Sequence, residues 1–511
     1  MESGSRILNS VRNFCYGLLS QVITVVLGFC VRSVFIKHLN IEYLGINGLF
    51  TSILTMLSLA ELGFGSAMIY ALYKPIAKQD TEKAASYLRF FSKVFYAVAL
   101  AVAVVGLCLL PFLQYFVRDY QGSLGDLRIY FLLFLAEAVV SYCVASKRSV
   151  FQADQKAYFL SAAHSAFIIA RSVLQIILLM LFSNFYFFLL TQIACTIGEN
   201  IYVARRARQT YPQLFDRKSL PLSVWQRRNI WCNVKALFLS RIGRVINYGA
   251  INILISAFIS IAVVGLYSNY VLISGTLSML VCQVIGAMTG SIGNFVAQES
   301  RDRQERLFYS ADFINFWLYA SCSICLFALI NPFISLWLGS EYLFDSFTVA
   351  LMVAIFYVEG MLQSVWNFRA AMGLFTQGKY RMLIAAALNV TLALALVGSL
   401  GLNGILLASL LSFLLVNAWY DPRIVMKCGL HRDVKHYYLM YVYRLACLLL
   451  SCYITSSIAA ILPLRESYLQ WGLGAAFVFA LANLLLILFN FRDPSFRSVG
   501  KLLMNFATRK F

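Results

Sequence analysis

Apolar runs of about 20 residues recur along the whole of this 511-residue chain. At about 1.5 Å of rise per residue, a helix of that length crosses the ~30 Å hydrocarbon core of a bilayer. The runs are continuous and lack the period-two alternation of a membrane-spanning strand, so helices must satisfy the backbone hydrogen bonds in lipid. We therefore predict an all-α integral membrane protein.

The pattern predicts about fourteen transmembrane helices. The longest apolar runs exceed the thickness of a bilayer, so we expect those helices to be tilted, kinked or extended beyond it. The predicted spans are 13–36, 44–73, 87–113, 126–146, 157–182, 186–206, 233–258, 262–295, 308–330, 345–372, 380–398, 402–420, 437–461 and 468–490.

Loop charge orients these spans. With a cytoplasmic N-terminus, the inner segments hold 29 Lys and Arg, whereas the outer loops hold 3, namely Lys37, Arg118 and Arg465. This asymmetry is the positive-inside pattern, and it predicts that both termini are cytoplasmic. It also explains most of the formal net charge of +20, so we expect no nucleic-acid partner.

The chain contains an internal repeat. The sequence around Gly45 resembles that around Gly265, and the segments at Pro111 and Tyr158 resemble those at Pro332 and Tyr380, with offsets of 220 to 222 residues. Six helices per copy is an even number, so both copies insert in the same orientation. We predict parallel repeats related by an axis along the membrane normal, a transporter arrangement that places substrate near the midplane between the halves.

The repeat divides the chain into five predicted parts. They are an N-terminal six-helix lobe (1–206), a cytoplasmic interlobe linker (207–232), a C-terminal six-helix lobe (233–420), two accessory helices (437–490) and a cytoplasmic amphipathic tail (491–511). In the tail, Phe496, Val499, Leu503 and Phe506 follow helical spacing, which predicts a helix on the inner membrane surface.

Arg241 and Arg244 lie near the middle of the predicted span 233–258, where each charge costs roughly 2.5–3.5 kcal/mol. Tyr248 and Asn252 follow them at helical spacing on the same face. Two arginines one turn apart repel each other, and an anionic ligand shared between them removes the repulsion. Guanidinium groups suit bidentate binding of phosphate, so this face is a candidate phosphate site.

Other mid-span polar residues are candidates for the same hydrated cavity. His164, Arg171 and Gln175 share one face, Glu359, Gln363 and Asn367 share another, and Glu61 and Glu137 lie on two further spans. The alternative is that the arginines and glutamates form structural ion pairs between helices. Arg32 either snorkels to the outer surface or lines the cavity, whereas Arg369 and Arg444, nearer the inner ends, are expected to snorkel.

Motifs for catalysis and for metal binding are missing from the sequence. The 12 cysteines fall almost entirely within apolar runs and are interpreted as small buried hydrophobic residues. There is no CxxC or Cys/His metal spacing in a loop, no phosphate-binding glycine loop and no nucleophile–base motif. We therefore expect no catalytic residue, no metal and no cofactor apart from coupling to H⁺ or Na⁺, and we expect a transporter rather than an enzyme.

The segments EYLGINGLFTSILTMLSLAELGFGSAMIYALYKPIAKQDTEKAASYLRFFSKVF (42–95) and VFQADQKAYF (150–159) carry a family resemblance. With fourteen spans and two six-helix halves, the chain resembles the multidrug/oligosaccharidyl-lipid/polysaccharide flippase superfamily. Within it, the specific resemblance is to bacterial polysaccharide flippases of the O-antigen and capsule type.

The resemblance implies flipping of undecaprenyl-diphosphate-linked oligosaccharide from the inner to the outer leaflet of the bacterial cytoplasmic membrane by alternating access. It implies a polysaccharide polymerase and chain-length machinery as partners, besides the bilayer itself. The residues expected to bind substrate in the central cavity are Arg241, Arg244, Tyr248, Asn252, Arg171, Arg32 and Gln363, and the candidates for ion coupling are Glu61, Glu137, Glu359 and His164.

Two other functions stay open. An ion-coupled multidrug antiporter on the same fold would use intramembrane carboxylates for coupling, but an arginine pair repels cationic drugs. A membrane glycan polymerase or ligase needs a catalytic site at the outer face, usually on a sizeable loop, and the outer loops are short. Both alternatives are therefore weaker than the flippase.

Overall fold

A computed structural model describes residues 3–58, 64–118, 125–216, 221–374, 377–378, 380–464 and 466–500 of the chain. Within these residues the regular structure is helical throughout and no strand occurs. The chain folds into two compact units, Met1–Gly265 and Leu266–Phe511.

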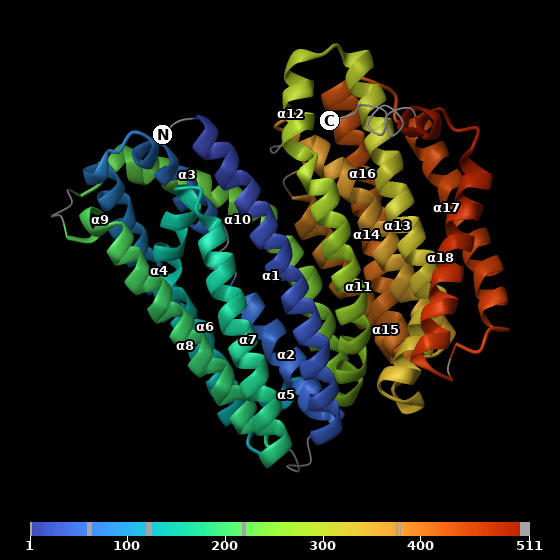
Figure 1. The fold of residues 1–511 in the computed structure, drawn as a ribbon, viewed down its shortest axis with the longest axis horizontal. Coiled ribbons are helices and arrows are strands. Elements are labelled where there is room, and N and C mark those ends of the chain that lie inside the picture. Colours follow the sequence, from blue (N-terminus) through green and yellow to red (C-terminus); the bar gives the residue numbers. More distant parts are fainter. Residues whose placement is uncertain are drawn as a thin grey trace. The chain divides into compact units, whose positions relative to one another are not determined.

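The first unit is a bundle of long helices (Figure 1). Among its helix pairs, α1 packs on α7, α6 packs on both α4 and α8, and α7 packs on α8. Its helices are α1 (Ser3–His38), α2 (Ile41–Leu57), α3 (Phe64–Ala77), α4 (Thr81–Leu109), α5 (Leu113–Phe116), α6 (Leu127–Ala153), α7 (Ala157–Phe182), α8 (Phe185–Thr210), α9 (Pro212–Asp216) and α10 (Val224–Phe258).

The second unit contains most of α11 (Ile261–Ala287) and everything after it. The remaining helices are α12 (Thr289–Gln298), α13 (Arg301–Trp337), α14 (Ser346–Ala371), α15 (Arg381–Ser412), α16 (Ala418–Arg423), α17 (Lys435–Ala459) and α18 (Tyr468–Asn490). Phe413–Asn417 and Ile424–Leu430 continue the helix around α16 as π-helical turns. Figure 1 shows α17 and α18 side by side, and both pack on α13.

Within the described residues, 11 helices are long and apolar enough to cross a membrane. One of them, Arg381–Leu430, is 50 residues long and is broken at Gly401 (φ 56°, ψ −131°), so it supplies two passes. The shorter apolar helices Ile41–Leu57 and Ile242–Phe258 bring the number of candidate passes to 14. The prediction of an all-α membrane protein with about fourteen spans is therefore confirmed.

The break at Gly401 makes a helical hairpin. The positive φ of Gly401 favours glycine, and a Cβ on Gly404 would lie 2.5 Å from the carbonyl oxygen of Leu396, which shows how closely the two arms approach. At the far end, Asn417 Nδ2 lies 3.3 Å from Met382 Sδ. The chain thus enters and leaves the predicted spans 380–398 and 402–420 at the same end, as two antiparallel passes.

Polar residues in the connections fix where several helices begin. Asp80, Asp126 and Asn184 each accept a backbone N–H from the first turn of α4, α6 and α8. Ser223 and Gln226 form a reciprocal capping box at the start of α10. Asp345 accepts N–H groups from the first turn of α14, and the hydroxyl of Thr348 helps to hold the pKa of Asp345 below its usual value.

The accessory helices and the start of the tail pack tightly on α13. Trp317 Nε1 donates to Asn483 Oδ1 of α18 at 2.9 Å, and the Trp317 ring stacks on Phe496. Phe496 and Val499 pack against the hydrophobic core of the second unit. The first two residues of the predicted apolar face of the tail therefore pack on this unit, and the other two, Leu503 and Phe506, lie outside the described residues.

The first turns of α2 and α11 approach each other closely at the two glycines that mark the repeat. A Cβ on Gly45 would lie 1.9 Å from the Ile261 carbonyl oxygen, and a Cβ on Gly265 would lie 2.3 Å from that of Ile41. The two contacts correspond to each other at an offset of 220 residues, because Gly45 corresponds to Gly265 and Ile41 to Ile261. The offset found in the sequence therefore recurs in this pair of contacts.

We expect Gly45→Ala to lower the free energy of unfolding by about 1–3 kcal/mol, because a methyl group there overlaps the Ile261 backbone and forces the helices apart. Gly28→Ala on α1 is the matched control, since a Cβ there meets nothing within 4 Å. Denaturant unfolding of the detergent-solubilised variants measures the difference. Equal stability of the two variants would contradict the close approach.

Candidate substrate and coupling site

The predicted phosphate-binding face lies on α10. Arg244 is exposed but also interacts with another group of the protein. Tyr248 is 44% exposed. Asn252 Nδ2 donates to Ser52 Oγ of α2 at 2.9 Å. Arg241 lies in the same helix, but its side chain is outside the described part of the structure. The Arg244–Tyr248 part of the face is accessible within the first unit, whereas Asn252 is engaged in helix packing.

Helix α10 packs within the first unit although the repeat assigns it to the second lobe. It contacts α2, α3 and α5, and Ser256 Oγ donates to the Phe116 carbonyl at 2.6 Å. Arg118 anchors the C-terminal end of α10 by donating to the Phe258 carbonyl and, through its backbone N–H, to the Ser256 carbonyl. A helix can belong to one copy of the repeat in sequence and pack on helices of the other, so the packing of α10 does not test the predicted lobe boundaries. These boundaries stay a prediction.

Two further candidate arginines lie on the paired helices α1 and α7. Hydrogen bonds join Asn13 to the Tyr158 backbone N–H at 2.6 Å near one end and His38 to Ser183 at 3.2 Å at the other. The two helices therefore run parallel with an offset of 145 residues. This offset places Arg32 of α1 roughly 9 Å further along the helix pair than Arg171 of α7.

Arg171 is only partly satisfied by the protein. Its Nε atom is buried without a hydrogen-bond partner in the described structure, and the residue interacts electrostatically with Cys195 of α8. A buried donor without a partner costs about 1–3 kcal/mol, more when it is charged. Arg32 is partly buried and makes an interaction of its own.

His164 belongs to an ion cluster that sequence reasoning missed. Glu199 of α8 is 2.7 Å from Arg148 of α6 and 3.3 Å from His164 Nδ1 of α7. Arg148 also donates to Asn200 Oδ1 at 3.1 Å. Glu199 is 10% exposed, while His164 is 46% exposed and forms the accessible side of the cluster. The cluster joins three helices of one unit around a titratable pair.

The hydrogen bonds described for Glu137 come from neutral side chains, and none comes from an arginine. It accepts from Gln192 Nε2 at 2.7 Å and from Thr196 Oγ1 at 2.9 Å. One face of α8 carries a stripe of polar residues at helical spacing, namely Gln192, Thr196 and Glu199. This stripe connects Glu137 with the ion cluster. This stripe has the same spacing as those recognised on other helices, so the sequence contained the signal.

The remaining candidates are distributed over the rest of the chain. Gln363 of α14 donates to Asn367 Oδ1 at 3.3 Å, and Asn367 donates to the Ile285 carbonyl at 3.1 Å, so these amides pack within the second unit. Glu359, also on α14, makes an interaction of its own. Glu61 lies outside the described residues. No cluster of His, Cys, Asp and Glu in the described structure has the composition of a metal site.

Arg369 and Arg444 do not snorkel, contrary to the sequence-based expectation. Arg444 is 1% exposed and its Nη1 lies 2.7 Å from Asp312 Oδ2 of α13. Arg369 is buried beside Asp421 at 3.1 Å, and Arg381 pairs with the same carboxylate. Both arginines lie too deep among helices for snorkelling, and a buried carboxylate compensates each charge. Sequence spacing gave no sign of partners 52 and 132 residues away.

Comparison with known proteins shows the fold. The sequence matches no family model and no curated protein. Among solved structures, it is similar to the lipid II flippase MurJ in an inward closed conformation, with 13% identity and a TM-score of 0.64, covering 94% of this chain and 99% of that one.

Multidrug transporters are similar over less of the chain. An outward-facing MATE transporter of the MOP superfamily is 14% identical with a TM-score of 0.55, covering 80% of this chain and 92% of its own. The Vibrio cholerae MATE transporter VcmN, in a mutant form, is 14% identical with a TM-score of 0.54, covering 83% and 99%. The chain therefore has the fold of these membrane transporters.

Proposed function

We propose that this protein flips undecaprenyl-diphosphate-linked oligosaccharide repeat units from the cytoplasmic to the outer leaflet of a bacterial inner membrane, for O-antigen or capsule-type polysaccharide. The observation that carries the proposal is the likeness to a lipid flippase over 94% of the chain, against 80% and 83% for the two multidrug transporters. A polysaccharide polymerase and chain-length machinery are the partners that this function would need.

The arginines of the first unit suit the charged part of such a substrate. A lipid diphosphate carries negative charge through a low-dielectric region and needs fixed donors there. Arg171 offers a buried N–H without a protein acceptor, and Arg244 offers an exposed guanidinium on α10. In the proposed mechanism these groups, with Arg241 and Arg32, hold the diphosphate, while Tyr248 contacts the glycan.

We further propose that transport is coupled to protons through His164 and Glu199. Imidazole is the side chain whose charge changes near neutral pH, and His164 is exposed on one side and bound to a carboxylate on the other. Protonation of His164 completes an ion pair with Glu199, which Arg148 already contacts. The charge of the cluster thus changes by one with each proton bound.

We expect His164→Ala to remove the dependence of transport on an imposed proton gradient and to lower the gradient-driven rate at least tenfold. His38→Ala is the matched control, because His38 bonds to Ser183 at the end of α1 and forms no ion pair in the described structure. Transport into vesicles with and without a pH gradient measures the effect. Unchanged gradient dependence in His164→Ala would refute coupling through this cluster.

An ion-coupled multidrug antiporter is the second candidate. The similarity to MATE transporters and the intramembrane carboxylates Glu137 and Glu199 favour it. Deleting the gene separates the two functions in cells. A flippase deletion causes lipid-linked repeat units to accumulate and surface polysaccharide to disappear, whereas an antiporter deletion sensitises cells to cationic dyes and leaves the polysaccharide intact.

A further inference from the structure

A cavity of about 590 Å³ opens in the second unit, and none of its lining residues belongs to the proposed transport site. It lies where α13 and α17 begin and α18 ends, and the segment after α18 closes one side. Its basic residues are Arg306, His436 and Arg492. The volume is within the range of sites that bind small ligands, roughly 300–1,000 Å³.

The charge of the cavity is positive and is not neutralised within the described structure. Arg306 and Arg492 are exposed and make no ion pair there. Asp493 also lines the cavity, but it accepts the Ser495 backbone N–H at 2.7 Å and lies 3.7 Å from Arg444. Its carboxylate therefore already has a backbone donor, Ser495, and a nearby arginine, Arg444. The two arginines are left to attract an anion.

The N-termini of two long helices add to this field. Arg306 is the sixth residue of α13 and His436 is the second residue of α17. A helix N-terminus carries roughly half a positive charge and favours anions nearby. The cavity therefore combines two guanidinium groups and one imidazole with the positive ends of two helix dipoles.

One wall of the cavity is apolar and exposed. Leu439 is 71% exposed and Tyr443 is 50% exposed, one turn apart on α17. The phenol of Tyr443 donates to the Phe489 carbonyl at 2.5 Å, which fixes its ring against the end of α18. An acyl chain fits this wall, whereas a soluble anion would leave it unused.

We infer that this cavity binds an anionic phospholipid, with its phosphate held by Arg306 and Arg492 and an acyl chain lying along Leu439 and Tyr443. The loop charge predicts that this end of the unit faces the cytoplasmic leaflet, where basic pockets between helices bind anionic headgroups. A bound lipid would fasten the accessory helices and the tail to α13. The inference does not depend on the transported substrate.

Native mass spectrometry of the full-length protein in mild detergent tests the inference, with added phosphatidylglycerol and, separately, phosphatidylcholine. We expect the wild type to bind one tightly held phosphatidylglycerol, and the pair Arg306→Ala and Arg492→Ala to weaken that binding at least tenfold. Arg205→Ala with Arg206→Ala at the inner end of α8 is the matched control, since it removes two exposed arginines elsewhere.

A second variant keeps the charge and fills the space. Ser498→Trp places a large side chain in the cavity and should also abolish the bound lipid. Equal binding of phosphatidylglycerol by all four proteins would overturn the inference. It would also fail if inorganic phosphate displaced the lipid at millimolar concentration, if phosphatidylcholine bound equally well, or if the lipid that copurifies in this site were a polyprenyl phosphate.

Discussion

Replacing Arg444 with alanine is expected to lower the free energy of unfolding by about 3–5 kcal/mol, the largest effect on stability that we predict. Arg444 and Asp312 are each 1% exposed and lie 2.7 Å apart. Asp312 also accepts the hydroxyl of Ser364 at 2.6 Å. Without Arg444, no other cation among the described residues pairs with the carboxylate of Asp312, and its charge is buried among α13, α14 and α17.

A double variant distinguishes the loss of a partner from the loss of volume. Arg444→Met with Asp312→Leu removes both charges and keeps apolar bulk, and it should recover most of the stability, because a buried ion pair is often no better than a packed apolar pair. Arg432→Ala is the exposed control, since Arg432 is 42% exposed and its ion pairs at the end of the bundle should contribute less than about 1 kcal/mol.

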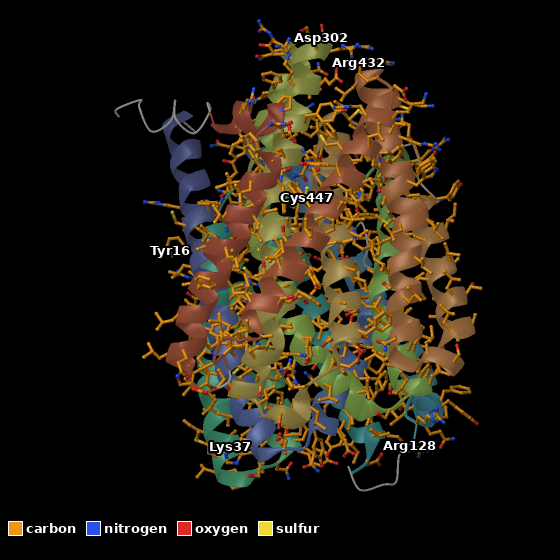
Figure 2. The ribbon with its side chains drawn as sticks, turned by 90° about the vertical axis from the view of Figure 1, so that its right-hand side faces the viewer. Tyr16, Lys37, Arg128, Asp302, Arg432 and Cys447 are labelled. Atoms are coloured by element: carbon orange, nitrogen blue, oxygen red, sulfur yellow. The ribbon has the colours of Figure 1, made fainter. Side chains whose placement is uncertain are left out.

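Denaturant unfolding in detergent provides the measurement for all three proteins. Figure 2 shows Asp302 and Arg432 together at one end of the second unit and Cys447, one turn after Arg444, in the middle of it. If Arg444→Ala were no less stable than Arg432→Ala, the buried pair would not hold α17 to α13 and α14.

Replacing Arg241 and Arg244 together with alanine is expected to reduce flipping at least 100-fold while the protein stays inserted and folded. Hydrogen bonds to charged groups contribute about 1.5–3 kcal/mol each, so losing two of them accounts for this factor. The argument for Arg244 rests on its exposed position on α10. That for Arg241 rests on its place one turn earlier in the same helix.

Charge and position serve as controls for this experiment. Lysine at both positions keeps the positive charges but loses bidentate geometry, and should recover part of the rate. Arg205→Ala with Arg206→Ala removes two exposed arginines at the end of α8 and should leave the rate unchanged. A double alanine variant that flips at the normal rate would rule out this face as the diphosphate site.

The sequence predicted the helices well because bilayer thickness limits their length. The breaks were predicted less well: 44–73 became α2 and α3, and 262–295 became α11 and α12. The repeat was visible through Gly45 and Gly265, because only glycine allows two backbones to approach so closely.

The site was predicted only in part because its residues meet across helices. Sequence periodicity assigned His164 to a polar face, but not to Glu199, which lies 35 residues away on another helix. Glu137 was assigned to a cavity-facing stripe, with an ion pair to an arginine as the alternative, but the sequence did not reveal its described partners, Gln192 and Thr196. Helical spacing reveals which residues share a face, and packing alone decides which faces meet.

Flipping by the purified protein in sealed vesicles tests the central claim most directly. Vesicles would carry undecaprenyl-diphosphate-linked oligosaccharide in one leaflet, and a membrane-impermeant enzyme acting on the glycan would report its arrival in the other. The proposed function predicts transfer that depends on the protein and is lost in the Arg241→Ala, Arg244→Ala variant, with no uptake of cationic dye. Proton-driven dye uptake without transfer of the lipid-linked glycan would contradict it and establish the antiporter instead.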